Sequence, residues 1–173
     1  MNLEMYREVL LAHNEQPHHF YPLSQPTHTA YGHNPLCGDE ITVYVRTEEK
    51  RVKELSFTGQ GCAVCKASAS LMTVRLEGQN IADAEKDAQA VLEWLNNATA
   101  EAPKDLGELE ALLGVRKFPM RIKCATLAWH AFLKALNQPT GSDEAKGSAC
   151  GCCGGRNTSD NCGHSDGCCG CGA

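Results

Sequence analysis

Apolar and polar positions repeat along the chain with two periods, and these periods predict a mixture of helices and strands. Alternation of apolar and polar residues predicts strands at residues 41–46 and 52–57, joined by a polar turn as a hairpin. Apolar residues at helical spacing, and an Ala- and Ser-rich run, predict helices at residues 3–13, 62–76, 81–95, 108–113 and 121–136. Pro17, Pro22 and Pro26 predict an irregular extended path between the first helix and the hairpin.

These elements predict an α+β fold, in which a small antiparallel sheet packs against helices and one exposed end carries the chemistry. From about Pro139 the chain has almost no aliphatic residues and many Gly, Ser and Asp residues. Such a segment cannot bury enough apolar surface to offset the conformational entropy lost on ordering. The sequence therefore predicts a folded domain at residues 1–138 and a disordered Cys- and Gly-rich tail at residues 139–173.

The charge balance argues against several classes of partner. The 173 residues carry a formal net charge of −5, whereas proteins that bind nucleic acids or anionic membranes present basic faces. Charged residues interrupt the apolar stretch that a signal peptide would need, and no apolar run approaches the roughly 18 residues of a membrane span. We therefore predict a cytoplasmic protein without nucleic-acid or membrane partners, whose 11 cysteines remain thiols in a reducing compartment.

The cysteines form two groups, and the larger group lies in the predicted tail. We refer to its members as the tail cysteines: Cys150, Cys152, Cys153, Cys162, Cys168, Cys169 and Cys171. Close cysteine pairs separated by glycine are typical of segments that wrap around soft metal ions such as zinc, copper or iron. Two interpretations of the tail fit its composition about equally. It is either a metal-binding segment or an extension with only incidental affinity for metals.

The other four cysteines lie in ordinary domain sequence, and three of them, Cys37, Cys62 and Cys124, lie where a predicted element begins or ends. Cys37 precedes the first strand of the hairpin, and in an extended chain Cys37 and Asp39 project from the same face. Cys62 follows a Gly-x-Gly turn at a predicted helix N-terminus, where exposed N–H groups and the helix dipole favour a thiolate.

Cys124 lies in the last predicted helix, beside Arg121 and Lys123, whose positive charges are expected to favour its thiolate. The three thiolates and the Asp39 carboxylate make a donor set that suits tetrahedral zinc. A thiolate-rich site of this kind also suits iron–sulfur units.

Each feature also has a simpler interpretation. Cys124 taken alone is more typical of a small core residue, and Asp39 after a glycine is more typical of a turn former. Cys62 and Cys65 have the Cys-x-x-Cys spacing of a thioredoxin-like redox pair, although no βαβ unit surrounds them. The histidines at positions 13, 18, 19, 28 and 33 fit a Pro-rich surface loop better than a set of ligands, because none has ligand spacing to a neighbour. On the residues alone, a metal or sulfur-transfer site is favoured.

Four short motifs occur in order: Asn34-Pro35-Leu36-Cys37-Gly38-Asp39, Gly59-Gln60-Gly61-Cys62-Ala63, Ala67-Ser68-Ala69-Ser70 and Arg121-Ile122-Lys123-Cys124-Ala125. They resemble the motifs of the U-type iron–sulfur cluster assembly family, which comprises IscU-like and SufU-like proteins and the N-terminal domains of NifU proteins. The resemblance covers roughly residues 3–136 and implies a SufE/NifU-like fold. Lys123 stands where the IscU branch has a histidine, and the stretch at 94–119 resembles the insertion of the SufU branch. The chain therefore resembles SufU-like members most.

The resemblance implies a role for each matching residue. The residues that match the metal ligands, expected to hold zinc, are Cys37, Asp39, Cys62 and Cys124. Cys124 also matches the residue that receives persulfide sulfur from a cysteine desulfurase of the SufS type. Arg121 matches a basic residue that assists ligand exchange when the partner docks, and Lys123 is a candidate accessory residue. Cys65 lies outside the family pattern. It is either an accessory thiol or a packed side chain, and packing is slightly favoured.

The resemblance thus implies a protein that accepts sulfur from the desulfurase and relays it to a downstream iron–sulfur scaffold or to apo-proteins. As an enzyme it would be at most a zinc-dependent sulfurtransferase. Two alternatives stay open. The same residues could bind iron and assemble a transient [2Fe–2S] cluster for transfer to apo-proteins, or the tail could make the chain a metal-storage protein.

Overall fold

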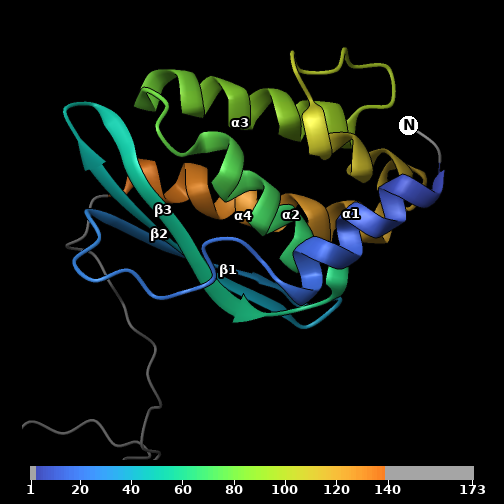
Figure 1. Ribbon diagram of the computed structural model, residues 1–173, viewed down its shortest axis with the longest axis horizontal. Coiled ribbons are helices and arrows are strands. Elements are labelled where there is room, and N and C mark those ends of the chain that lie inside the picture. The colour runs from blue at the N-terminus through green and yellow to red at the C-terminus, as the bar shows by residue number, and fades with distance from the viewer. Residues whose placement is uncertain (1–2, 139–173) are drawn as a thin grey trace, which may run out of the picture. The chain divides into compact units, whose positions relative to one another are not determined.

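The described part of the chain folds as helices packed on a small sheet (Figure 1). The computed structural model describes residues 3–138. Its helices are α1 (Leu3–Glu15), α2 (Ala63–Leu76), α3 (Ile81–Asn96), the 3₁₀-helix η1 (Gly107–Lys117) and α4 (Pro119–Asn137). Its strands, antiparallel in the order β1-β2-β3, are β1 (His28–Asn34), β2 (Asp39–Glu48) and β3 (Arg51–Gln60). The predicted α+β fold is confirmed, whereas the predicted disordered tail lies outside the described residues.

Strand β1 is the element that the sequence prediction lacked. It pairs with β2 from His28 opposite Val45 to Asn34 opposite Asp39, so a tight turn leads the chain into β2. Within β1 only Ala30 and Asn34 are buried, and polar residues and a glycine interrupt the apolar pattern. Pairing with β2 therefore does more to hold this strand than its own apolar residues do, and apolar periodicity alone does not reveal it.

Strands β2 and β3 form the predicted hairpin. Their pairing runs from Glu40 opposite Gln60 to Glu48 opposite Arg51. Alternate residues of β2 face the core, beginning with Asp39. Asp39 thus shares the buried face of β2 with Ile41 and Val43, which places a carboxylate at the end of that face, whereas Cys37 lies in the turn and not in the extended chain.

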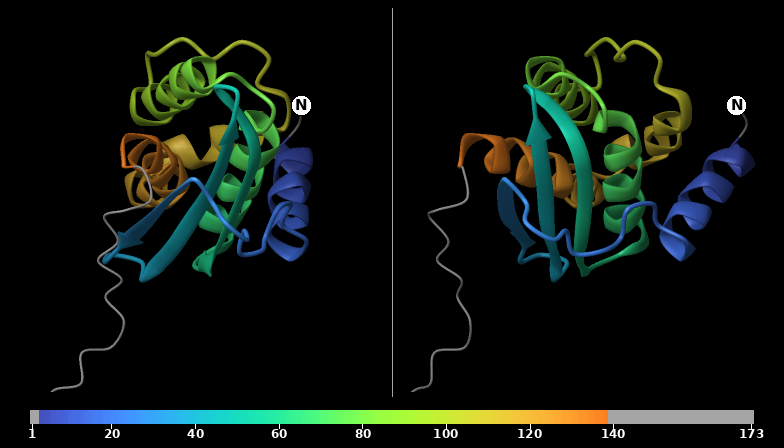
Figure 2. Two further views of the ribbon diagram at one scale, coloured as in Figure 1. Left: turned by 90° about the vertical axis from the view of Figure 1, so that its left-hand side faces the viewer. Right: turned by 60° about the vertical axis from the view of Figure 1, so that its left-hand side comes forward.

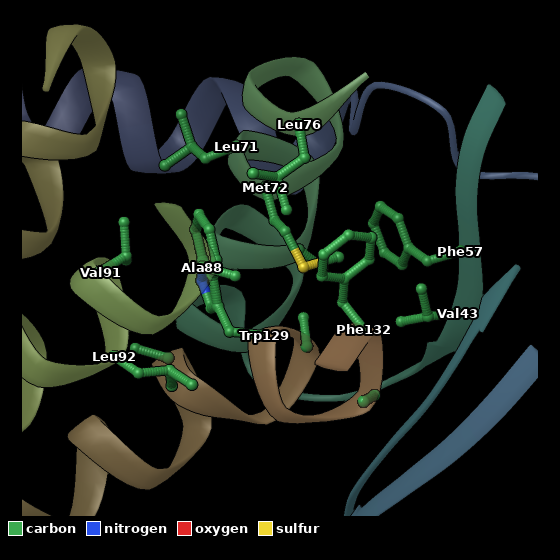
Figure 3. Packing of buried hydrophobic residues seen from close by; sticks show 14 of the residues in the cluster. Val43, Phe57, Leu71, Met72, Leu76, Ala88, Val91, Leu92, Trp129 and Phe132 are labelled. Carbon is green, nitrogen blue, oxygen red and sulfur yellow. The ribbon is translucent and has the colours of Figure 1, made fainter. Parts of the chain in front are cut away.

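The helices cover one face of the sheet. Helix α4 packs on β1 and β2, α2 packs on β3, and α1 packs on α2 and η1 (Figures 1 and 2). Figure 3 shows Val43 and Phe57 from the strands facing Met72 of α2 and Phe132 of α4, while Trp129 of α4 lies toward α3. Each of these side chains is fully buried, and burial of an aliphatic or aromatic side chain contributes about 1.5–3 kcal/mol. The packing fixes the two cysteine-bearing helices, α2 and α4, relative to the sheet.

Buried hydrogen bonds also join α2 to its neighbours. The Ser68 hydroxyl donates to the Ala125 carbonyl at 2.6 Å and accepts from Trp129 Nε1 at 3.0 Å. On the opposite side of α2, Ser70 Oγ lies 2.7 Å from His13 Nδ1. His13 is thus a buried helical residue, and two other histidines lie in β1, so the surface-loop prediction is wrong for all three.

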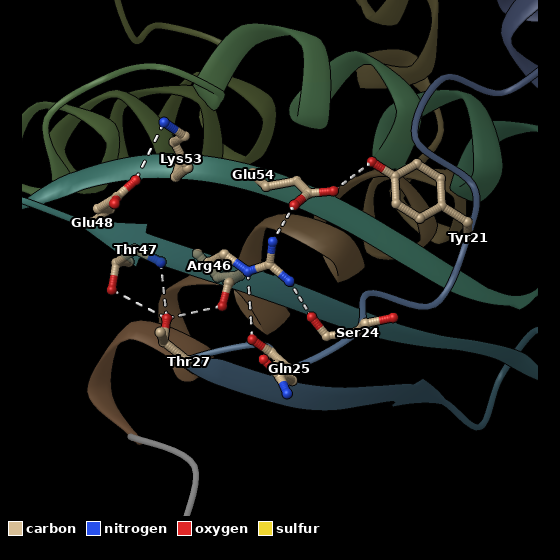
Figure 4. Close-up of polar contacts among 10 residues, drawn as sticks. Tyr21, Ser24, Gln25, Thr27, Arg46, Thr47, Glu48, Lys53 and Glu54 are labelled. Carbon is tan, nitrogen blue, oxygen red and sulfur yellow. Dashed lines mark hydrogen bonds and ion pairs between the residues drawn. The ribbon is translucent and has the colours of Figure 1, made fainter.

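Polar contacts hold the segment before β1 against the sheet (Figure 4). Arg46 of β2 donates to Glu54 of β3 at 2.9 Å and to the carbonyl oxygen atoms of Ser24 and Gln25. Glu54 also accepts a hydrogen bond from the Tyr21 hydroxyl at 3.1 Å. These contacts give the proline-containing path a defined course into β1.

Helix boundaries matter most where the cysteines lie. Helix α2 begins at Ala63 with Cys62 as its N-cap, close to the prediction. Helix α4 begins at Pro119, two residues earlier than predicted, so Cys124 lies in its second turn. Proline suits the first helical turn because it has no N–H group to leave unpaired. The helix predicted at 108–113 is the longer 3₁₀-helix η1. Within residues 3–138, no helix has both the length and the apolar character needed to cross a membrane.

Candidate metal centre

Three side chains of metal-ligand type meet where the β1–β2 turn approaches helix α4. Cys37 lies in the turn, Asp39 is the first residue of β2, and Cys124 lies in α4. One ligand atom from each residue lies within 4.8 Å of the others, and the two sulfur atoms are 3.2 Å apart. Cys37 is exposed whereas Asp39 and Cys124 are buried, so the group reaches the surface at the turn.

Cys62 joins this group from helix α2 through Asp39. Its backbone N–H donates to Asp39 Oδ1 at 2.8 Å, and its Sγ lies 3.8 Å from Asp39 Oδ2. Cys62 is exposed, and its own side chain makes no capping hydrogen bond. We call Cys37, Asp39, Cys62 and Cys124 the donor group. The fold brings all four predicted ligands together, with Cys62 at the edge of the tighter group of three.

A glycine beside Cys62 leaves room for the Asp39 carboxylate. A Cβ atom at Gly61 would lie 2.9 Å from Asp39 Oδ1, closer than real Cβ atoms approach their neighbours. Gly59 has a φ of +148°, and a Cβ atom there would lie 2.1 Å from the carbonyl oxygen of Glu40. The Gly-x-Gly turn therefore lets the start of α2 approach β2 closely. The turn is recognisable in the sequence, whereas the contact between Gly61 and Asp39 is not, because it joins residues far apart in the chain.

Asn34 is a buried neighbour of the donor group that the sequence analysis did not single out. Its Nδ2 lies 3.5 Å from Cys124 Sγ, and its Oδ1 accepts a hydrogen bond from the Leu36 N–H at 3.2 Å. Its backbone carbonyl accepts from the N–H groups of Cys37 and Gly38. Asparagine before a turn is a recognisable signal for such local bonds, but no sequence pattern pairs Asn34 with a thiol in another element.

The electrostatics of Cys124 differ from the sequence-based expectation. Burial raises the pKa of the Cys124 thiol, and its hydrogen bonds to neighbouring side chains of the donor group act in the same direction. Arg121 and Lys123 are exposed, and the Arg121 guanidinium lies over the ring of Phe118, 5.0 Å from its centroid. The prediction that these two positive charges favour the Cys124 thiolate is therefore wrong: burial and the neighbouring side chains of the donor group raise the pKa of the thiol, and neither exposed charge lowers it.

Cys65 lies behind the donor group rather than in it. Its side chain is 1% exposed and belongs to the apolar core. Burial raises the pKa of Cys65 to about 12, and the nearby negative charges of Asp39, Cys62 and Cys37 add to the effect. A protonated, enclosed thiol agrees with the packing interpretation of Cys65.

The donor group fits a tetrahedral, thiophilic metal ion. Three thiols and one carboxylate are all ligand types that Zn²⁺ accepts, and they come from the β1–β2 turn, the start of β2, the N-cap of α2 and helix α4. Among residues 3–138, no histidine belongs to a group of potential ligands this close together. The tail cysteines, predicted as a second metal-binding segment, lie outside the described residues.

Comparison with known proteins decides the family. Residues 5–138 match the model of the NifU-like N-terminal domain. The chain belongs to this family. The iron–sulfur cluster assembly scaffold protein IscU of Streptococcus pyogenes serotype M1 is 37% identical to it, over 78% of this chain and 84% of that protein. The zinc-dependent sulfurtransferase SufU of Bacillus subtilis (strain 168) is 34% identical, over 80% of this chain and 94% of that protein.

A solved structure agrees with the fold of this NifU-like domain. The crystal structure of a protein described only as hypothetical is 37% identical, with a TM-score of 0.72 over 79% of this chain and 100% of that chain. The family resemblance read from the four motifs is therefore confirmed. The chain is a member of the IscU/SufU family of iron–sulfur cluster assembly scaffold proteins.

Proposed function

We propose that this NifU-like domain protein accepts sulfur at Cys124 from a cysteine desulfurase of the SufS type. It then relays the sulfur to a downstream iron–sulfur scaffold or to apo-proteins, in the cytoplasm. The residues that would hold zinc are those of the donor group. The observation that carries the proposal is the convergence of three thiols and the Asp39 carboxylate, with Cys124 Sγ 3.2 Å from Cys37 Sγ. Similarity to a relative named a zinc-dependent sulfurtransferase supports it.

Zinc bound by the donor group would keep its cysteines as thiolates near neutral pH and shield them from oxidation. The chain itself controls access to the acceptor. Cys124 is only 2% exposed and its sulfur contacts Cys37 and the Met120 carbonyl, so a persulfide on another protein reaches it only when the β1–β2 turn or the first turns of α4 move. Arg121 and Lys123 are exposed on these same turns of α4. We assign Arg121 to assisting ligand exchange there, with Lys123 as an accessory positive charge.

The transfer step is a thiol–persulfide exchange. The Cys124 thiolate attacks the outer sulfur of the desulfurase persulfide and forms a new bond between that sulfur and Cys124 Sγ. The bond between the outer sulfur and the desulfurase cysteine breaks, and its electron pair leaves on that cysteine as a thiolate. No external oxidant or reductant is needed, because the sulfur atom changes partners without a net change of oxidation state.

Exposed apolar residues beside the donor group give the desulfurase a surface to bind. Leu36, Phe118 and Met120 are 56%, 51% and 53% exposed. Leu36 adjoins Cys37, and the Met120 carbonyl lies 3.7 Å from Cys124 Sγ. Exposed apolar side chains rimmed by charged ones are typical of protein docking sites. A partner bound at this surface would contact the β1–β2 turn and the first turn of α4, the two segments next to Cys124.

A second function is favoured by similarity to a relative named an assembly scaffold. Three cysteines of the donor group could hold iron and sulfide, delivered as cargo, as a transient [2Fe–2S] cluster for transfer to apo-proteins. We further propose that residues 1–138 act as the assembly domain and residues 139–173 as a metal-binding tail. Metal storage by the tail cysteines is the third candidate.

Desulfurase turnover tests the relay function. A SufS-type enzyme is assayed with L-cysteine and the full-length protein in which every tail cysteine is changed to serine. We expect this protein to raise turnover and to gain one sulfur atom on Cys124, located by tandem mass spectrometry. The Cys124→Ala variant should do neither, and the Cys65→Ala variant should behave as the parent does.

Two outcomes would change the conclusion. Equal stimulation by the parent and by Cys124→Ala would remove Cys124 as the acceptor. Absence of stimulation, together with a stable cluster formed from iron and sulfide under anaerobic conditions, would replace the relay by the scaffold function.

A further inference from the structure

Asn34 links the turn that carries Cys37 to the sulfur of Cys124. Its Oδ1 accepts the Leu36 N–H at 3.2 Å, which fixes the orientation of the amide and leaves Nδ2 facing Cys124 Sγ at 3.5 Å. The backbone carbonyl of Asn34 accepts the Gly38 N–H at 2.9 Å, so the residue is anchored at both ends. Asn34 is 6% exposed, and water therefore competes little for its amide hydrogen atoms.

An N–H donor aimed at this sulfur distinguishes two chemical states of Cys124. A thiolate carries its negative charge on Sγ, where it accepts a charge-assisted hydrogen bond. In a persulfide, the negative charge lies on the outer sulfur, and the bridging Sγ is only a weak acceptor. The Asn34 donor therefore stabilises unloaded Cys124 more than loaded Cys124. This difference favours release of the sulfur over its retention.

We propose that Asn34 is a further catalytic residue, which stabilises the Cys124 thiolate as the leaving group when sulfur passes to the next acceptor. This role rests on the relay function proposed above. In the release step, a thiolate of the acceptor attacks the outer sulfur, and the bond from that sulfur to Cys124 Sγ breaks. The electron pair of the broken bond stays on Sγ, where it meets the Asn34 amide hydrogen, and any proton on the outer sulfur leaves with that sulfur.

The test separates release of sulfur from its acceptance. Full-length protein with the tail cysteines changed to serine is loaded with inorganic polysulfide. Loss of the Cys124 persulfide after addition of dithiothreitol is then followed by tandem mass spectrometry. Asn34→Ser keeps an oxygen that can cap the turn but is too short to reach Cys124. Asn34→Asp keeps the shape and replaces the donor with an anionic acceptor. Pro35→Ala alters the same turn and leaves the donor in place, which makes it the matched control.

We expect release to slow about tenfold in Asn34→Ser, because a hydrogen bond to a charged atom changes a rate by roughly this factor. Release should be at least as slow in Asn34→Asp and close to the parent rate in Pro35→Ala. In Asn34→Ser, the rate at which Cys124 accepts sulfur from the desulfurase should change much less than the rate of release. A turn that is merely loosened would slow both rates alike.

Release at the parent rate in Asn34→Ser, or equal slowing in Pro35→Ala, would overturn the role of Asn34. Polysulfide loading needs no desulfurase, so the two proposals fail separately. If the desulfurase cannot load Cys124, the relay function falls while the effect of Asn34 on the sulfur can still be measured.

Discussion

The backbone N–H of Cys62 donates to Asp39 Oδ1 at 2.8 Å, and this contact ties the start of helix α2 to the start of strand β2. The Cys62 side chain makes no capping hydrogen bond, so Asp39 caps the helix from another element. The second carboxylate oxygen, Oδ2, lies 3.8 Å from Cys62 Sγ. One side chain therefore serves both the fold and the donor group, through different oxygen atoms.

Replacing Asp39 separates these two tasks. In Asp39→Ala the Cys62 N–H loses its acceptor, and we expect the free energy of unfolding to fall by about 1–3 kcal/mol. In Asp39→Asn one side-chain oxygen remains to accept the bond, so the loss should be clearly smaller. Urea unfolding in the presence of a metal chelator measures both. Glu40→Ala, at the more exposed neighbouring position, should stay within about 0.5 kcal/mol of the parent. Equal losses in the two Asp39 variants would show that the hydrogen bond is not what Asp39 contributes to stability.

Gly61→Ala should disturb the donor group without removing any of its members. The added Cβ atom would lie 2.9 Å from Asp39 Oδ1, so the carboxylate or the start of α2 must shift. We expect a lower zinc affinity in competition with a chromophoric chelator. The matched control is Gly114→Ala, because a Cβ atom there has no neighbour within 4 Å among the described residues. Unchanged zinc affinity in Gly61→Ala would mean that Asp39 does not contribute to binding.

The sequence predicted the members of the donor group but not their surroundings. Motifs around Cys37, Cys62 and Cys124 were recognisable because each lies at the start or end of an element, next to glycine or basic residues. Asn34 and Gly61 act through contacts with side chains of other elements, and such contacts follow only from the packed fold. The effect of Arg121 and Lys123 on the Cys124 thiol was predicted wrongly for the same reason. The sequence shows which residues are neighbours along the chain but not how deeply a thiol is buried.

The fold was predictable where one face of an element is strongly apolar. The hairpin of β2 and β3 and the helices α3 and α4 have such faces, whereas α2 was recognised by its Ala- and Ser-rich run, and the positions of all of them were close to those expected. Strand β1 has too few buried residues to produce a pattern, and it owes its place to pairing with β2. The burial of His13 was missed because its partner in α2, Ser70, is distant in the sequence.

Two buried serines should respond in opposite ways to loss of the hydroxyl group. Ser68 Oγ bonds to both the Ala125 carbonyl and Trp129 Nε1, so Ser68→Ala leaves the buried Trp129 Nε1 unpaired and removes a second bond from the Ala125 carbonyl, which lies inside helix α4. We expect a loss of about 1–3 kcal/mol in the free energy of unfolding, the cost of one buried donor left without an acceptor. Ser56 Oγ is buried without a hydrogen-bond partner among the described residues, so Ser56→Ala should be neutral or stabilising. Urea denaturation of both variants checks the contrast, and similar losses in the two would contradict these assignments.

Cys65 should react much more slowly than the exposed thiols of Cys37 and Cys62. Its burial, together with nearby negative charges, raises the pKa of the thiol from an ordinary value of 9.0 to about 12. After removal of metal by a chelator, N-ethylmaleimide at pH 8 should label the exposed Cys37 and Cys62 quickly and label Cys65 only after urea is added. Peptide mass spectrometry reads each site separately. Labelling of Cys65 at the rate of Cys62 in the folded protein would contradict its place in the core.

The same shift of pKa predicts how Cys65 affects stability at high pH. Below pH 9 the thiol is protonated in both the folded and unfolded states, and its contribution is constant. Between pH 9 and 12 the unfolded chain releases the proton while the folded protein keeps it, so the stability that this thiol contributes declines as pH rises. The free energy of unfolding should therefore fall more steeply over this interval in the parent than in Cys65→Ala, as measured by urea unfolding at several pH values. Parallel curves for the two proteins would show that Cys65 ionises as readily in the folded protein as in the unfolded chain.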